Sequence, residues 1–314
     1  PAVTRDGVAV EVAANAADPR DVADAVAQGA DGIGLLRTEF AFLGRAQAPT
    51  EEEQLEVYRA AARALDGRPL VIRTLDAGAD KPLPYLDLAP EANPFLGVRG
   101  IRLGLARPAL LAAQLRAIVR VAAEHGNVKA MLPMVATRGE LRAARALLVA
   151  ALADTGARPR PGFELGIMVE VPAAALTADR LAVDVDFLSI GTNDLTQYAL
   201  AAERGNAAVA ALADGLHPAV LALVARVCDA AAARGRWVGV CGELAADPLA
   251  VGLLVGLGVR ELSVAAPSVA AVKAAVRALD AGAARALARR ALAAGAADEV
   301  RALVVSEPDA AGRR

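Results

Sequence analysis

The chain has little cysteine and little lysine, and each shortage narrows the kind of protein it can be. Cys228 and Cys241 are the only cysteines and form no CxxC pair. This excludes a disulfide framework and a cysteine-based zinc site, and it indicates a reducing compartment. Only Lys81, Lys129 and Lys273 are lysines among 34 basic residues, so each lysine stands out against the arginines.

Long apolar runs and a strong net charge are also absent. Mean hydropathy is +0.39, yet no uninterrupted apolar stretch reaches the ~18 residues that a membrane span needs. A formal net charge of -2 gives no general attraction for nucleic acid or anionic membranes, and no signal-peptide pattern is present. We expect a cytoplasmic protein without membrane insertion or a nucleic-acid partner. Because the first residue is Pro1 rather than methionine, we also expect the natural N-terminus to lie upstream.

Eight short apolar runs alternate with longer helical patterns, as in a chain of βα units. Near-continuous apolar character is typical of parallel strands buried on both faces. Eight such units over about 250 residues predict an α/β fold, a closed (β/α)8 TIM-type barrel. A doubly wound open sheet remains the alternative, since periodicity alone does not distinguish the two. The runs are VAVEVAA, DGIGLLR, LVIRTLD, KAMLPMV, ELGIMVE, VDFLSIG, WVGVCGE and ELSVAAP.

One long connection interrupts this alternation, after the third strand. Residues 77–108 are rich in proline and glycine, and connections of this length are usually functional. Before it, Thr50 and Glu53 form a capping-box pattern at the start of a helix. We expect the barrel to span residues 1–280, followed by a helical extension over 281–304 and a flexible tail over 305–314.

Polar side chains stand at the ends of five of the predicted strands. In a barrel of this kind the active site lies at the carboxyl ends of the strands. Two arginines close together call for an anion between them, because guanidinium groups match phosphate and carboxylate geometry. Two carboxylates are too few for a calcium site but suit magnesium, which also takes substrate oxygens and waters. The strand-end residues are Arg37, Arg73, Glu170, Asn193, Asp194 and Cys241.

Each of these residues also has a structural interpretation. A strand-end arginine can be solvated or paired in an ion bridge, and Glu170 or Asp194 could simply cap the following helix. Cys228 lies at helical spacing within LALVARVCDAAAA and is interpreted as a buried filler. His125 is expected at a helix C-terminus and His217 in a loop or at a helix start. The Gly32-x-Gly34 pattern is too incomplete to indicate nucleotide binding.

Seven segments resemble enzyme I of the bacterial phosphoenolpyruvate-dependent sugar phosphotransferase system. They occur in order on successive strand ends, and the resemblance covers nearly the whole chain, to about residue 280. Pyruvate phosphate dikinase and phosphoenolpyruvate synthase are similar but more distant. The segments are LLRTEF (35–40), IRTLDAGADKPLPYL (72–86), NPFLGVRGIR (93–102), GIMVEVPAA (166–174), SIGTNDLTQY (189–198), ERGN (203–206) and CGELAADP (241–248).

The resemblance implies a role for each matching residue. Glu170 and Asp194 match the ligands of a Mg²⁺ cofactor, and Cys241 matches the acid that protonates the enolate to give pyruvate. A thiol near its ordinary pKa of ~8.5 is mostly protonated at neutral pH and can donate. Ala79 and Ala246 stand where the family often has glycine, which affects loop geometry only. The residues matching substrate contacts are Arg37, Arg73, Asn193, Asp194 and Arg204, with Lys81 and Arg99 in adjoining motifs.

The resemblance also implies partners outside this chain. In the family the phosphoryl acceptor is a histidine on a separate N-terminal domain, and His125 and His217 lack its surroundings. We therefore expect the N-terminal phosphohistidine and carrier-binding domains to be absent here, with that domain and a phosphocarrier protein as partners. A homodimer is expected, because the family generally pairs through this barrel.

Three other functions stay open at this point. One is the C-terminal domain of a dikinase or synthase, which differs in its partner rather than in its donor chemistry. Another is a magnesium-dependent carbon–carbon lyase on the related barrel, for which Cys241 would be superfluous. The last is a phosphoenolpyruvate-sensing or dimerising module without turnover.

Overall fold

A computed structural model describes residues 1–78, 83–86 and 88–307, and its central feature is a closed barrel of eight parallel strands. The strands pair in chain order from β2 to β9, and β2 also pairs with β9. The predicted (β/α)8 barrel is therefore confirmed, and the open-sheet alternative is wrong. The strands are β2 (Ala9–Ala16), β3 (Ile33–Arg37), β4 (Leu70–Arg73), β5 (Val128–Leu132), β6 (Leu165–Val169), β7 (Phe187–Ile190), β8 (Trp237–Val240) and β9 (Glu261–Val264).

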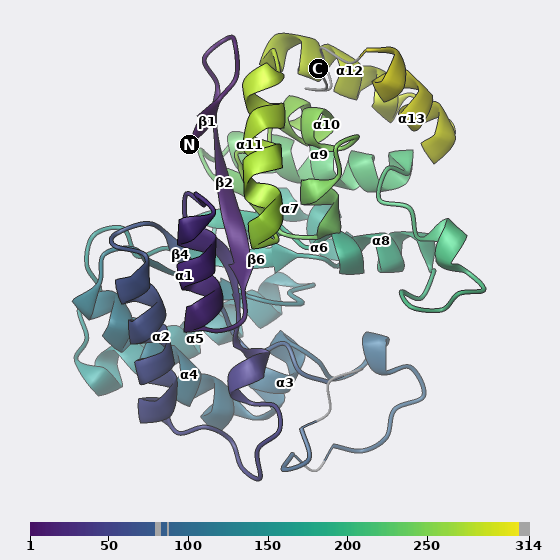
Figure 1. Cartoon of the computed structure of the whole chain (residues 1–314). Coiled ribbons are helices and arrows are strands. Elements are labelled where there is room, and N and C mark those ends of the chain that lie inside the picture. Colours follow the sequence, from purple (N-terminus) through teal and green to yellow (C-terminus); the bar gives the residue numbers. More distant parts are fainter. Residues whose placement is uncertain (79–82, 87, 308–314) are drawn as a thin grey trace.

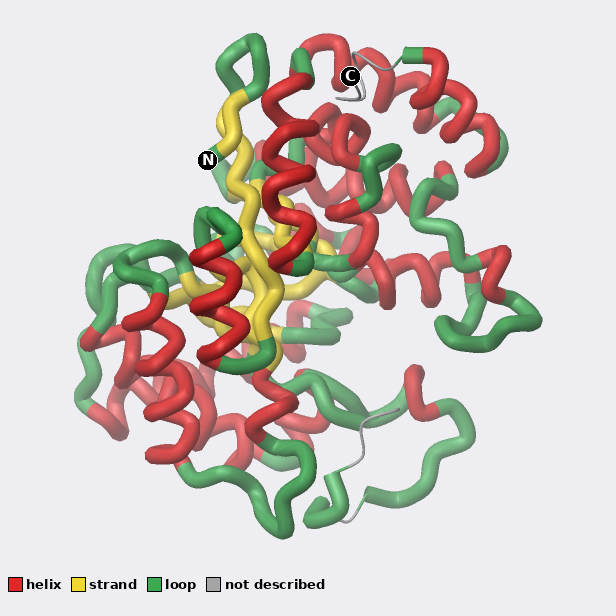
Figure 2. The backbone as a smooth tube through the Cα atoms, in the orientation of Figure 1, coloured by secondary structure: helices red, strands yellow, loops and turns green. Residues whose placement is uncertain are grey.

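Helices lie around the outside of the strands (Figures 1 and 2). The capping box predicted from Thr50 and Glu53 begins α2, and Thr137 with Glu140 forms a second one before α5. The helices are α1 (Pro19–Ala27), α2 (Glu51–Ala64), α3 (Ile101–Ala106), α4 (Pro108–Glu124), α5 (Arg138–Thr155), α6 (Pro172–Leu176), α7 (Ala178–Leu181), α8 (Thr192–Leu200), α9 (Pro218–Ala232), α10 (Val251–Leu257), α11 (Val269–Ala278), α12 (Ala281–Leu292) and α13 (Ala297–Ser306).

The chain termini add elements outside the eight βα units. β1 (Ala2–Val3) pairs antiparallel with β2 and was not predicted, because two residues carry no readable pattern. The Asp6 carboxylate accepts hydrogen bonds from the backbone of Ala281 and Gly282, which ties this hairpin to the start of α12. α13 ends at Ser306, and residues 308–314 of the predicted tail lie outside the described part. The division at residues 280 and 304 stays a prediction.

The long connection predicted after the third strand follows β4. It contains a short 3-10 turn at Pro94–Leu96, and α3 lies inside the predicted range of 77–108. Gly100 has φ +56 and approaches Met134 so closely that a Cβ there would lie 2.8 Å from the Met134 Cβ. This close approach brings the far end of the connection back to the barrel rim.

A cluster of apolar side chains lies inside the barrel, below the polar groups at the carboxyl ends of the strands. Leu35, Val71, Met131 and Met168 form one buried cluster with Phe187, whose ring stacks on Trp237 at 4.5 Å. Cys241 belongs to the same cluster and marks where the apolar core meets the rim.

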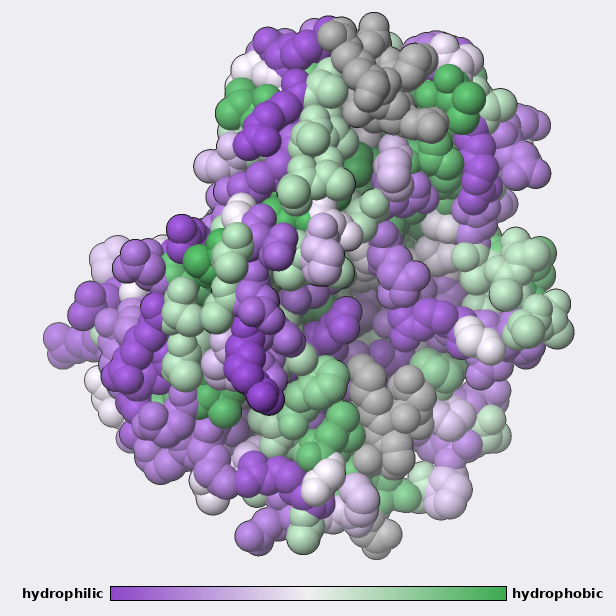
Figure 3. Space-filling model, in the orientation of Figure 1, coloured by the Kyte–Doolittle hydropathy of each residue, from purple (hydrophilic) through white to green (hydrophobic). Residues whose placement is uncertain are grey.

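Hydrophilic and hydrophobic residues are interspersed over the face drawn in Figure 3. Within the described ranges, no helix is both long enough and apolar enough to cross a membrane.

Candidate active site

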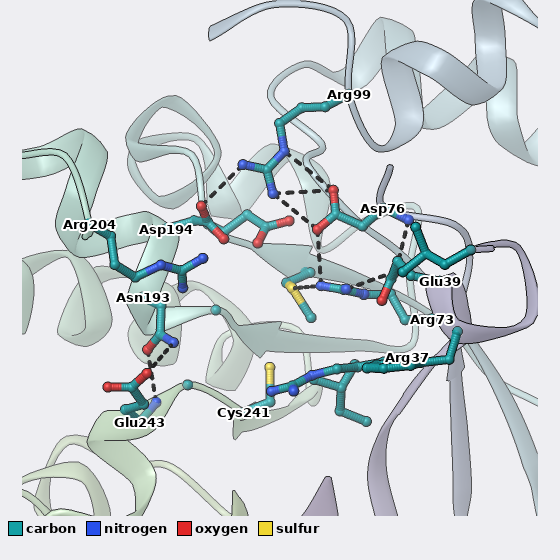
Figure 4. Close-up of a pocket in the computed structure, with 17 residues that line it drawn as sticks. Arg37, Glu39, Arg73, Asp76, Arg99, Asn193, Asp194, Arg204, Cys241 and Glu243 are labelled. Atoms are coloured by element: carbon teal, nitrogen blue, oxygen red, sulfur yellow. Dashed lines mark hydrogen bonds and ion pairs between the residues drawn. The ribbon is translucent and has the colours of Figure 1, made fainter. Parts of the chain in front are cut away.

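A cavity of about 300 Å³ opens at the carboxyl ends of the barrel strands (Figure 4). It brings together every described residue that the sequence predicted for the site, although these residues come from five strand ends and two longer connections. Lys81 lies outside the described residues. The predicted residues lining the cavity are Arg37, Arg73, Arg99, Glu170, Asn193, Asp194, Arg204 and Cys241.

Arg73 is held on the cavity wall by two carboxylates that the sequence did not single out. Its Nη2 lies 2.9 Å from Glu39 Oε1, and its Nη1 lies 3.3 Å from Asp76 Oδ2. The same Glu39 oxygen accepts from the backbone N–H of Asp76 at 3.0 Å. Among the described residues, Arg73 Nε and Glu39 Oε2 are buried without a hydrogen-bond partner. A buried donor left unpaired is costly unless a ligand satisfies it.

Arg99 links the long connection to α8. Its guanidinium donates from Nη2 to both Asp76 oxygens, at 3.2 and 3.0 Å, and from Nη1 to Asp194 Oδ1 at 3.2 Å. Burial alone would lower the pKa of Arg99, but the negative charges of Asp76 and Asp194 raise it above its ordinary value. Arg99 is therefore a permanent cation between the two aspartates.

Glu170 is almost fully buried at the end of β6. Burial, with repulsion from Asp76 and Asp194, raises the pKa of Glu170 to about 8. One oxygen accepts a hydrogen bond of 2.6 Å from the Met134 backbone N–H. Met134 adopts φ +56, a conformation that non-glycine residues rarely adopt. The alternative that Glu170 and Asp194 cap helices is wrong, because neither α6 nor α8 has a side-chain cap.

Arg37 and Arg204 differ from the buried arginines in having no counter-charge. Both are exposed, and within the described part of the chain neither side chain has an ion-pair partner. Their guanidinium groups point into the cavity from opposite sides (Figure 4). The Arg204 backbone is fixed by its N–H, which donates to Gln197 Oε1 at 2.7 Å. The cavity mouth thus presents two uncompensated positive charges.

Cys241 lines the cavity floor and is 4% exposed. Its thiol lies 3.7 Å from the Ile190 carbonyl oxygen, and burial raises the pKa of Cys241 to about 11. The expectation of an ordinary thiol pKa near ~8.5 was therefore wrong, because it took no account of burial. The higher pKa keeps the thiol protonated at neutral pH. Beside it, Asn193 and Glu243 bond each other twice, at 3.2 and 2.9 Å.

The structural interpretations of the remaining residues are confirmed. Cys228 is buried in α9, His125 ends α4, and His217 accepts from Ala219 N–H at the start of α9. The sequence analysis missed Glu39 and Asp76, which lie in the LLRTEF and IRTLD segments already singled out. The sequence does carry a signal for both, because each acidic residue follows a strand-end arginine within three positions.

The chain is similar to known proteins over nearly its whole length. A family model described as the PEP-binding domain of PEP-utilising enzymes matches residues 1–281. A phosphoenolpyruvate-protein phosphotransferase from Bacillus sp. (strain S) is 48% identical over 305 residues, which are 96% of this chain and 53% of that protein. A multiphosphoryl transfer protein from Xanthomonas campestris pv. campestris is 51% identical over 303 residues, covering 96% of this chain and 36% of that protein. The chain thus spans about half, or less, of these relatives' length.

Among solved structures, a citrate lyase from Burkholderia xenovorans LB400 superposes with a TM-score of 0.55. The match covers 99% of this chain and 95% of that one, at 17% sequence identity. At that identity the likeness concerns the fold alone.

Proposed function

This chain belongs to the PEP-utilising enzymes, and we propose that it binds phosphoenolpyruvate with Mg²⁺ and donates the phosphoryl group to a histidine on a separate domain, releasing pyruvate. The activity is that of a phosphoenolpyruvate-protein phosphotransferase, the name of the Bacillus relative. It is the first step of phosphotransferase sugar uptake.

The observation that carries the proposal is the pair of unpaired guanidinium groups, Arg37 and Arg204, on opposite sides of one cavity. Two exposed guanidinium groups that face one space, neither of them in an ion pair within the described residues, form a site suited to an anion, because their planar geometry matches phosphate and carboxylate. Phosphoenolpyruvate has a phosphate and a carboxylate on three carbons, so one molecule can contact both guanidinium groups. The buried, unpartnered Nε of Arg73 is a further donor for it. Asn193 lines the same space and supplies an amide.

The buried charges favour a divalent cation beside the substrate. Four carboxyl groups, those of Glu39, Asp76, Glu170 and Asp194, are buried in the cavity wall beside the guanidinium groups of Arg73 and Arg99, and burial with their mutual repulsion raises the pKa of Glu170, so that a cation could take the place of its proton. We assign Glu170 and Asp194 as magnesium ligands. No cluster of three or more ligating side chains exists within the described ranges, so substrate oxygens and waters would complete the shell. Bound magnesium supplies charge neutralisation for the phosphate and carboxylate.

Cys241 supplies the proton in this proposal. Loss of the phosphoryl group leaves the enolate of pyruvate, which needs a proton at its terminal carbon. The thiol is held protonated by burial, so its S–H bond breaks as the C–H bond forms. The resulting thiolate recovers its proton from solvent after pyruvate leaves. The guanidinium groups of Arg37 and Arg204 stabilise the anionic phosphoryl group in transit.

We propose a histidine-bearing N-terminal domain, a phosphocarrier protein and a second copy of the chain as partners. The relatives' names support protein partners, since the Bacillus name describes phosphoryl transfer from phosphoenolpyruvate to protein and the Xanthomonas name describes transfer of several phosphoryl groups. They favour this function over a dikinase or synthase. The lyase likeness adds no support to lyase activity, because it is a likeness of fold only.

A reconstitution tests the proposed function. The chain is mixed with the part of the Bacillus relative that lies outside the matched 305 residues, with labelled phosphoenolpyruvate and with Mg²⁺, and both labelled protein and pyruvate are measured. We expect equal amounts of phosphohistidine and pyruvate, formed only when both proteins are present. Absence of both products, while the full-length relative is active under the same conditions, would contradict the proposal.

A further inference from the structure

Gln114, on α4, lies behind the cavity wall, and both polar atoms of its side-chain amide are hydrogen-bonded. It is 1% exposed and does not line the cavity. Its Oε1 accepts from the backbone N–H of Leu75 at 2.8 Å. Its Nε2 donates to Thr38 Oγ1 at 3.2 Å and to the Tyr58 hydroxyl at 2.9 Å. One neutral side chain therefore contacts three separate segments.

Two of those contacts reach the strand ends that bear substrate arginines. Thr38 follows Arg37 directly, and its hydroxyl donates to the Arg73 carbonyl oxygen at 2.9 Å. Leu75 stands two residues beyond Arg73. Arg37 and Arg73 are also register partners across β3 and β4. Gln114 thus bonds to the chain just past both arginines, where strand pairing has ended.

The third contact anchors the amide in the interior. The Tyr58 hydroxyl donates to Gln54 Oε1 at 3.2 Å, and Gln54 Nε2 donates to the Pro49 carbonyl oxygen at 3.2 Å. Tyr58 and Gln54 belong to α2 and are fully buried. Every donor in this series has an acceptor, so the network has a single favoured arrangement. Satisfied buried networks of this kind rigidify what they connect.

We infer that Gln114 is a positioning residue, which holds the segments after β3 and β4 at the spacing that lets Arg37 and Arg73 grip one anion. It is uncharged and fully hydrogen-bonded, so its contribution is geometric rather than electrostatic. Misplacing a binding group by about 1 Å through a distant substitution can cost up to ~10²-fold. The inference rests on the proposed function, because it assumes that the anion is phosphoenolpyruvate.

The test is calorimetric titration of phosphoenolpyruvate, with Mg²⁺, into the wild-type chain and the Gln114→Met variant. Methionine has similar length but leaves Leu75 N–H, Thr38 Oγ1 and the Tyr58 hydroxyl without their amide partner. We expect affinity to fall ~10-fold or more. Leu141→Ala, a fully buried change on α5, is the control for lost stability and should leave affinity unaltered.

A second readout separates positioning from general damage. Glu170 and Asp194 come from other elements, so Mn²⁺ affinity measured by spin resonance should be the same in wild type and Gln114→Met. Equal phosphoenolpyruvate affinity in the two would overturn the inference, as would a matching loss of Mn²⁺ affinity. A wild-type chain that binds no phosphoenolpyruvate would instead contradict the proposed function.

If Gln114→Met does not fold, Tyr58→Phe carries the test. It removes one acceptor of the Gln114 amide and one donor to Gln54, but keeps the Gln114 contacts with Thr38 and Leu75. We expect a ~3-fold loss of phosphoenolpyruvate affinity for this smaller displacement. Unchanged affinity in that variant would also overturn the inference.

Discussion

Replacing Cys241 separates its assigned role from that of a buried filler. As a filler, the side chain should tolerate alanine with only a change in stability. As the proton donor, it acts after the substrate has bound, so Cys241→Ala should leave phosphoenolpyruvate affinity nearly unchanged. Pyruvate formation with the histidine domain supplied should slow by ~10²-fold or more, the usual effect of losing a general acid.

The structure also sets how reactive this thiol should be. With a pKa of about 11, about one thiol in 10⁴ is ionised at pH 7, against about one in 30 for a thiol at the ordinary ~8.5. Because the thiolate is the reactive form and the side chain is almost fully buried, alkylation by iodoacetamide at pH 7 should be much slower than for free cysteine. Alkylation should accelerate steadily from pH 8 to 10, while the acid stays protonated for catalysis throughout.

The assay pairs pyruvate release with substrate binding for each variant. Cys228→Ala is the matched control, because Cys228 is equally buried in α9 but does not line the cavity. It should retain the wild-type rate. Wild-type turnover in Cys241→Ala would mean that the acid lies elsewhere. Fast alkylation at pH 7 would show that the thiol is not held protonated by burial.

Two further predictions concern buried charges. Burial, and then repulsion from Glu11, raises the pKa of Glu261 to about 8. The folded protein therefore binds this proton more tightly than the unfolded chain does. The stability that protonated Glu261 contributes is complete below the unfolded pKa of ~4.5 and is lost as the pH rises to 8. The free energy of unfolding of Glu261→Gln in urea, relative to wild type, should therefore increase from pH 5 to 8 and then level off, and a constant difference would refute this. Arg99→Met should destabilise the fold by ~3–5 kcal/mol, because it leaves the Asp194 carboxylate buried without its cation and removes one of the two arginines paired with Asp76. It should also tighten Mn²⁺ binding without substrate by freeing Asp194, and weaker Mn²⁺ binding would count against the metal assignment. Arg102→Met is the control, because Arg102 in α3 pairs with Glu140 at 3.5 Å and does not line the cavity; it should show neither effect.

The barrel was predictable from sequence because parallel strands buried on both faces leave uninterrupted apolar runs. All eight runs became strands, and the polar groups after them, such as Arg37 and Glu170, met at one rim as the fold requires. Strand order and closure needed the structure, since no single run shows that β2 pairs with β9.

The buried charges could not be predicted in the same way. Arg99 bonds to Asp76 and Asp194, which are 23 and 95 positions away from it in the sequence, and only the tertiary structure brings them together. The raised pKa of Cys241 depends on burial that a sequence does not reveal. Gln114 appears in the sequence as one polar residue within an otherwise ordinary helical pattern.

Titration of the chain with phosphoenolpyruvate, once with Mg²⁺ and once with a chelator, tests the central claim most directly. With the metal, we predict binding that releases a proton, because Glu170 holds one at neutral pH and must lose it to coordinate a cation. Without the metal, we predict affinity at least ~10-fold weaker, since the buried carboxylates then repel the substrate. Equal affinity under the two conditions, or no binding in either, would contradict a magnesium-dependent phosphoenolpyruvate site at the rim of this barrel.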